Sequence, residues 1–119
     1  MGEKNPAGEA TSVRQIQLRD ERLTTGVLSA LWAWIGPDGE LHLDGQDLGP
    51  LDWVGALDGE YEYHRTIAPE DFPALIKRLG GQPDDDVLAL LARDHSGMKS
   101  LRMELSLRDA PFPTRLYVH

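Results

Sequence analysis

Hydrophobic residues follow two different spacings along the chain, first that of β-strands and later that of α-helices. Between residues 27 and 35, apolar side chains occupy both alternating sets of positions. Successive strand residues point to opposite faces, so a segment that is apolar on both faces is typical of a strand inside a sheet. The turn sequence Gly36-Pro37-Asp38-Gly39 follows, and residues 40–44 alternate between polar and apolar. Residues 27–44 are therefore predicted to form a β-hairpin.

The segment after this hairpin is rich in glycine. Residues 45–59 contain four glycines and one proline with apolar residues between them. The segment is too apolar for a free linker and too interrupted for a regular element, so we expect a packed loop, with a short helical turn at residues 51–56. Residues 60–67 alternate again, which predicts a further strand with Tyr61 and Tyr63 on its apolar face.

Helical spacing begins after residue 68. One stripe at i, i+3, i+4 and i+7 consists of Phe72, Leu75, Ile76 and Leu79. A second helix is expected to begin between Pro83 and Asp86, with Asp84-Asp85-Asp86 capping its start rather than binding a metal. Residues 99–109 suit a strand, by strict alternation, or a helix with a stripe of Met98, Leu101 and Leu105, which their composition favours. A last strand is expected at residues 114–118.

These elements predict an α+β domain: an antiparallel sheet of three to four strands with two to three C-terminal helices packed on one face. Residues 1–15 lack hydrophobic periodicity and are expected to form a mobile tail, which leaves residues 16–119 as the single domain. Residues 16–22 could begin a strand or a short helix. The helix leucines, together with Trp32 and Trp34, are expected in the core.

Charge and composition make several classes of function less suited to this chain. The chain of 119 residues has 20 acidic and 12 basic side chains, a formal charge of −8, and no cysteine. The negative field opposes binding to nucleic acid or anionic membranes and suits a basic protein partner, although solubility alone would also explain it. The lack of cysteine excludes thiol catalysis and cysteine-ligated metals. With no apolar stretch near the ~20 residues of a membrane span and no secretory signal, a cytoplasmic location is expected.

Four short blocks resemble a family of small uncharacterised actinobacterial proteins, which carry a Gly-Gln-Asp-Leu-Gly-Pro loop and a Glu-Tyr-Glu-Tyr strand. The blocks are Leu31-Trp32-Ala33-Trp34, Asp38-Gly39-Glu40-Leu41-His42-Leu43, Gly45-Gln46-Asp47-Leu48-Gly49-Pro50 and Glu60-Tyr61-Glu62-Tyr63. The resemblance covers residue 27 to the C-terminus and implies a helix at residues 99–109, but no activity. In size and charge the chain is also similar to immunity proteins, which neutralise a toxin. The glycines of the Gly45–Pro50 block are interpreted as a structural tight turn, since the block lacks the ending of a phosphate loop.

The polar faces of two predicted strands carry the candidate chemistry. Glu40, His42 and Asp44 share one face of the first, and Glu60, Glu62 and His64 share one face of the other. If these strands are neighbours, two imidazoles and four carboxylates form one patch. Such a patch could ligate a divalent metal, pair as general acid and base, bind a partner, or simply face water.

The leading hypothesis is a non-enzymatic module that binds a basic protein partner, in the manner of an immunity or inhibitor protein, with no cofactor, metal or catalytic residue. The candidate partner-binding residues are Glu40, His42, Asp44, Asp47, Asp52, Trp53, Glu60, Glu62 and His64. One alternative is a small metal-binding or enzymatic domain that uses His42 and His64 with Glu60 and Glu62. Another is a structural homodimer formed through Leu48, Leu51 and Trp53.

Overall fold

The computed structural model of the protein describes residues 14–51 and 56–118. Within these ranges the strands are β1 (Arg14–Arg22), β2 (Leu28–Ile35), β3 (Leu41–Leu51), β4 (Ala56–Ile67) and β5 (Arg115–Val118). The helices are α1 (Phe72–Arg78), α2 (Val87–Asp94) and α3 (Lys99–Leu107), and a short 3-10 helix, Pro69–Asp71, precedes α1.

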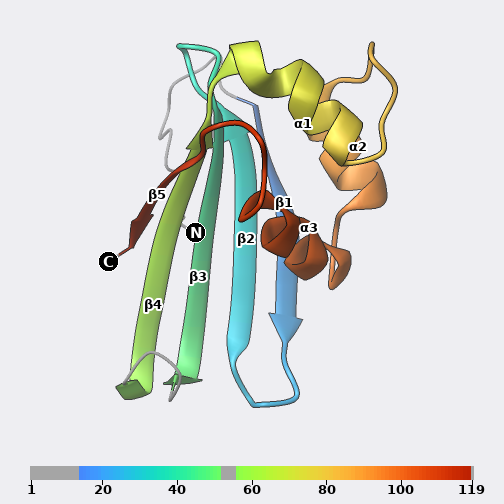
Figure 1. The fold of residues 1–119 in the computed structure, drawn as a ribbon. Helices are drawn as coiled ribbons and strands as arrows, with labels where there is room; N and C mark the ends of the chain where they lie inside the picture. The colour runs from blue at the N-terminus through green and yellow to red at the C-terminus, as the bar shows by residue number, and fades with distance from the viewer. Residues whose placement is uncertain (1–13, 52–55, 119) are drawn as a thin grey trace.

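The five strands form one antiparallel sheet in the order β1-β2-β3-β4-β5, so that each strand pairs with its neighbour in sequence. All three α-helices come between β4 and β5 and lie on one side of the sheet (Figure 1). The predicted α+β class is confirmed. The sheet has five strands rather than three or four, because residues 14–22 form the edge strand β1, where the sequence left strand and short helix open for residues 16–22. This strand begins before the expected domain boundary at residue 16.

The packed loop predicted at residues 45–59 is wrong. Strand β3 continues to Leu51 and β4 begins at Ala56, so most of this segment belongs to a long hairpin. Gly45 pairs with Tyr63 and Gly49 with Gly59, and the register shifts between Gly49 and Leu51. Backbone pairing thus extends through residues whose composition favours a loop. The helical turn expected at residues 51–56 falls largely outside the described residues.

Gly45 and Gly49 lie within strand β3 and do not form the predicted tight turn. A Cβ atom on Gly45 would lie 2.0 Å from Cζ of Tyr63, so the tyrosine ring occupies the space that a side chain would need. Gly49 has a φ of 123°, a backbone conformation that glycine adopts readily and other residues rarely do. It lies at the register shift, where such a conformation is typical of a β-bulge.

The core lies between the helices and the sheet face that they cover. Its most buried members are Leu31, Ala33, Leu41, Leu43, Ile67, Leu75, Leu90 and Leu91. Trp32 and Trp34 are not core residues, contrary to expectation, and both are only half-buried. Because Leu31 and Ala33 point into the core, the alternation of β2 directs both tryptophans to the opposite side of the sheet.

The helices follow the predicted segments. Asp86 is the N-cap of α2, and its carboxylate accepts a hydrogen bond from the backbone N–H of Ala89 at 3.0 Å, which confirms the capping interpretation. Residues 99–107 form a helix, α3, as the composition favoured. Among residues 14–51 and 56–118, no helix has the length and apolar character needed to cross a membrane.

The orientation of α3 differs from the predicted one. Its buried residues are Ser100, Met103 and Leu107, whereas Leu105 is exposed and Leu101 half-buried. The expected leucine stripe therefore points away from the core. This orientation places the Ser100 hydroxyl on the sheet side together with Met103 and Leu107, and it leaves α3 with a second apolar side.

Candidate functional site

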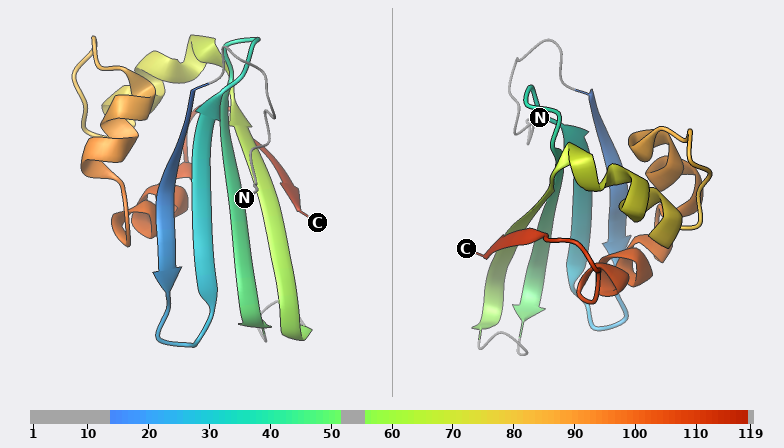
Figure 2. Two further views of the ribbon diagram at one scale, coloured as in Figure 1. Left: turned by 180° about the vertical axis from the view of Figure 1, so that it is seen from behind. Right: turned by 45° about the horizontal axis from the view of Figure 1, so that its top comes forward.

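The side of the sheet that faces away from the helices carries most of the predicted site residues. We call this surface the open sheet face; its central residues are Trp32, Trp34, His42, Asp44, Gln46, Glu60, Glu62 and His64. The register pairs Asp44 with His64 and Gln46 with Glu62, which brings the polar faces of β3 and β4 together as the sequence predicted. Seen from this side, the strands have no helix of the described chain in front of them (Figure 2, left).

Four of these side chains form a contiguous cluster. The Nε1–H group of Trp34 donates to Oδ2 of Asp44 at 2.9 Å, and Oδ1 of Asp44 contacts Nδ1 of His64. Nε2 of His64 lies 3.1 Å from Nδ1 of His42. The imidazole of His42 stacks on the Trp34 indole, with ring centroids 3.9 Å apart and an angle of 12° between the planes. We call this set the Trp–His cluster: Trp34, His42, Asp44 and His64.

The surroundings of His42 in the Trp–His cluster favour its neutral form. Burial lowers the pKa of His42, and the charge that His64 can carry lowers it further. A contact between two ring nitrogens needs one donor and one acceptor, so both rings cannot be protonated at these atoms. One arrangement that satisfies every contact has His42 donating to His64 and His64 donating to Asp44. The cluster is thus a continuous chain of polar contacts that holds each ring in place.

The two glutamates of β4 lie beside the Trp–His cluster and not within it. The Nε2 group of Gln46 donates to Glu60 at 2.6 Å and to Glu62 at 3.3 Å. One amide therefore holds two carboxylates close together on the open sheet face. The predicted set of His42 and His64 with both glutamates is not assembled around a common point.

A different group could in principle hold a cation. Among the described residues, ligand atoms of Asp38, Glu40 and His42 lie within 4.8 Å of one another. However, both carboxylate oxygens of Glu40 accept hydrogen bonds from Arg115, at 3.0 and 2.9 Å. A guanidinium at this distance opposes a second cation, so the group is better explained as a link between the start of β3 and β5.

One predicted site residue of the described chain, Asp47, is not on this surface. Asp47 points to the helix side of the sheet, where its Oδ1 accepts a hydrogen bond from Ser29 at 2.7 Å. The loop interpretation had grouped Asp47 with the acidic patch, but as part of β3 it alternates away from Asp44 and Gln46. Asp52 and Trp53 lie outside the described residues.

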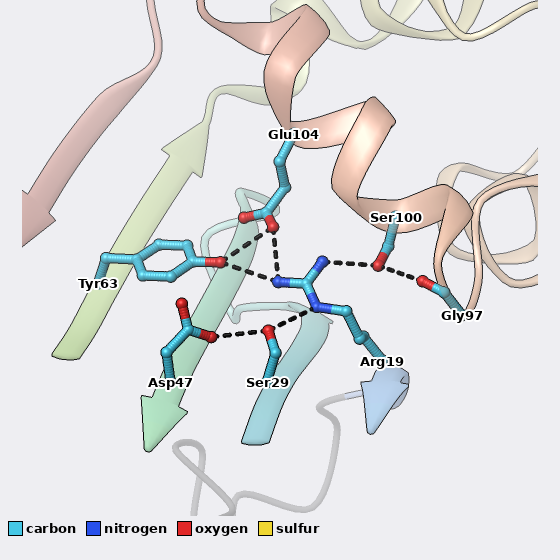
Figure 3. A network of polar contacts seen from close by, with 7 residues as sticks. All are labelled: Arg19, Ser29, Asp47, Tyr63, Gly97, Ser100 and Glu104. Atoms are coloured by element: carbon cyan, nitrogen blue, oxygen red, sulfur yellow. Dashed lines mark hydrogen bonds and ion pairs between the residues drawn. The ribbon is translucent and has the colours of Figure 1, made fainter. Parts of the chain in front are cut away.

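A buried arginine on the helix side was not predicted from the sequence. Arg19 is 2% exposed, and its guanidinium joins β1 to β2, β4 and α3 (Figure 3). Its three nitrogens donate to Ser29 Oγ at 2.9 Å, Ser100 Oγ at 2.7 Å, Tyr63 Oη at 3.1 Å and Glu104 Oε1 at 2.8 Å. The one signal in the sequence was Ser29, which interrupts the apolar stretch of β2.

Tyr63 completes this network, which we call the Arg19 network: Arg19, Ser29, Asp47, Tyr63, Ser100 and Glu104. Its hydroxyl donates to Glu104 Oε1 at 2.9 Å. Burial strongly raises the pKa of Tyr63, and the Glu104 carboxylate raises it further, so the phenol remains protonated and keeps this donor. Each nitrogen of the buried guanidinium thus has an acceptor, as a buried charge requires.

A cavity of about 570 Å³ opens beside the Arg19 network, between α3 and the helix-side face of β4 and β5. Its lining residues are Asp47, Tyr61, Tyr63, Arg65, Leu101, Glu104, Leu105, Arg108, Thr114 and Leu116. The exposed side of α3 forms one wall, and the tyrosines of β4 belong to the other. The second apolar side of α3 therefore faces this cavity.

Comparisons with family models, with curated proteins and with solved structures found no match to this chain. The resemblance to the actinobacterial family and the likeness to immunity proteins remain predictions. The functional argument consequently depends on the geometry of the two sheet faces.

Proposed function

We propose that the protein is a non-enzymatic interaction module that binds a basic protein surface through its open sheet face, as an inhibitor or immunity protein would. The observation that carries the proposal is the Trp–His cluster with its neighbouring carboxylates on a sheet face that no helix of the described chain covers. A sheet normally has one face against a core and the other in water. Here the second face carries large aromatic rings, which are costly to leave in water.

The aromatic residues are suited to an interface because they are held in place before binding. Trp34 is fixed by its hydrogen bond to Asp44 and by its stack on His42. Tyr117, on β5, is more than half exposed, and its ring centroid lies 6.4 Å from that of His64. Rigid tryptophan and tyrosine side chains bury large areas with little loss of conformational entropy, which is why they dominate binding energies at interfaces.

The charge of the face defines the partner. Asp44, Glu60 and Glu62 cluster on two adjacent strands, and the whole chain carries a formal charge of −8. A basic surface would be attracted over several ångströms and oriented by this patch, so that association is fast at low salt. Lysine or arginine side chains of the partner could insert between the paired glutamates and pack on the tryptophans.

The experiment compares two double variants with equal changes in charge. Glu60→Gln/Glu62→Gln alters the open sheet face, and Glu70→Gln/Asp84→Asn alters two exposed acids on the helical side. We expect wild type and the second variant to retain the same basic protein from an extract of the producing cells. The open-face variant should bind it at least tenfold more weakly, and the wild-type affinity should fall as salt is raised.

The proposal fails if the two double variants bind the partner equally, because net charge alone would then account for binding. The alternative of a metal-binding or enzymatic domain is separated by titration with zinc or manganese. A bound metal would raise the melting temperature by mass action, and His42→Phe would abolish that rise. The interaction proposal expects no change in melting temperature from either metal.

A further inference from the structure

The cavity between α3 and β4 has features of a small-molecule site. Its volume of about 570 Å³ lies within the ~300–1,000 Å³ typical of ligand pockets. It is on the opposite side of the sheet from the open sheet face, so it is independent of the function proposed above. We propose that this cavity binds a small organic carboxylic acid with an apolar body, and that Arg65 receives its carboxylate.

The walls of the cavity are suited to an apolar body. Leu101 and Leu105 are one helical turn apart on α3 and line the same cavity. Leu105 is 56% exposed and Leu116, on β5, is 48% exposed, which is high for leucine. The rings of Tyr61 and Tyr63 lie opposite, with centroids 5.7 Å apart. A bound apolar chain would remove these surfaces from water, a favourable change.

Arg65 is a buried charged residue of the cavity wall whose hydrogen-bonding groups are only partly paired. The residue is only 8% exposed, and its Nη1 donates to Thr114 Oγ1 at 2.9 Å. Its Nε is buried and has no hydrogen-bond partner within residues 14–51 and 56–118, and no carboxylate of those ranges forms an ion pair with Arg65. A buried donor without a partner is costly, and buried charges are normally paired.

The pairing of Arg65 can be compared with that of Arg19, the other buried arginine of the described chain. Both arginines point to the helix side of the sheet and are at least nine-tenths buried. Arg19 pairs with Glu104 and donates from all of its nitrogens, whereas Arg65 has a single hydroxyl acceptor in the described chain. Arg65 thus differs from Arg19 in having no carboxylate partner in the described chain. A guanidinium presents its donors in a planar fork that suits this group.

The other charges around the cavity are of both signs. Glu104 is neutralised by its ion pair with Arg19. Asp47 keeps its negative charge, but it pairs with Tyr61, four residues before Arg65 on β4, so it lies away from the Arg65 end of the cavity. Arg108, the C-cap residue of α3, adds a second positive charge to the rim. The positive charge available to a ligand is therefore greatest at the Arg65 end of the cavity.

Decanoate is a suitable probe, with 1-decanol as a neutral control of the same chain length. We expect decanoate, below its micellar concentration, to bind saturably by calorimetry and to raise the melting temperature. Decanol should bind at least tenfold more weakly, since it leaves the guanidinium without a counter-ion. Equal affinity for the two compounds would overturn the role of Arg65.

Two variants test the location. Arg65→Met keeps the side-chain volume and should reduce decanoate affinity at least tenfold. If that variant does not fold, Leu105→Glu serves instead: the position is exposed, and its carboxylate would repel the ligand at the cavity wall. The matched control is Met98→Glu, because Met98 is 52% exposed but lies outside this cavity. Decanoate binding that is unchanged by Leu105→Glu, or reduced equally by Met98→Glu, would refute the site.

Discussion

Arg19 and Glu104 are 85 residues apart in sequence and form an ion pair at 2.8 Å inside the domain. The pair joins β1, the first strand of the sheet, to α3, the last helix. Their side chains are 1% and 12% exposed, respectively, so water competes little for either group. This contact fixes one side of α3 to the sheet, and the first two predictions concern its surroundings.

Replacing Arg19 with methionine should destabilise the fold by about 3–5 kcal/mol, because Glu104 would remain buried without its counter-ion. Urea denaturation followed by circular dichroism measures this change. Arg93→Met is the control, since Arg93 forms its ion pairs with Asp85 and Asp94 at the surface. We expect its urea midpoint to equal that of wild type. A similar loss in both variants would show that the Arg19 network contributes no more than a surface pair.

Gly45→Ala should be destabilising by about 1–3 kcal/mol, the usual cost of forcing a methyl group into occupied space. The new Cβ would meet the ring of Tyr63, whose hydroxyl is held by Arg19 and Glu104, so the ring cannot move without breaking these bonds. Gln46→Ala, at the next position, should cost less than ~1 kcal/mol because its side chain points to the open sheet face. Equal unfolding free energies for the two variants would contradict this packing.

Stability should fall as the solution is acidified through the histidine range. The pKa of His42 in the fold lies below the model-compound value of 6.5. Between these two values the unfolded chain binds more protons than the folded one, so acidification favours unfolding. The contribution is fully present above 6.5 and is lost as the pH drops towards the folded pKa. His42→Phe, which keeps a ring on Trp34, should show a smaller decrease in urea midpoint between about pH 8 and pH 5.

Asp86 permits a test that separates a helix cap from an ion pair. Arg14, by hydrogen bonding, holds the pKa of Asp86 at about 2, so its contribution is present above 3.8 and lost as the pH falls through 2. Asp86→Ala removes both the cap and the pair and should cost about 0.5–2 kcal/mol at neutral pH. Asp86→Asn retains a capping side chain and should cost less. If Asn and Ala are equally destabilising, the exposed pair with Arg14 is the dominant effect.

Local sequence determined which residues share a strand face. The alternation at residues 40–44 and 60–67 was sufficient to place His42 with Asp44 and Glu60 with Glu62 and His64, because the strand period depends only on backbone geometry. Helix α2 and its cap at Asp86 were predicted for the same reason: the stripe spacing and the capping carboxylate are features of a few adjacent residues.

Tertiary structure decided which faces are covered. The alternation of β2 is compatible with either of its faces meeting the helices, and only the position of the helices places Leu31 and Ala33 inside and Trp32 and Trp34 outside. Likewise Gly45 has the composition of a turn but lies in a strand, because the ring of Tyr63, from a different strand, needs its space. The spacing of apolar residues within one strand does not show which other strand or helix will pack against it.

The partners of Arg19 and Arg65 were likewise decided by the tertiary structure. Both are arginines on strands, and nothing in their neighbouring residues distinguishes the one that finds Glu104 from the one whose Nε has no partner in the described chain. That difference arises where α3 crosses the sheet, over β1 and β2 (Figure 1). Local sequence determined the strand faces at residues 40–44 and 60–67 and the positions of the helices. Burial and the pairing of charges depend on contacts between segments far apart in the chain, which form only when the sheet and helices pack together.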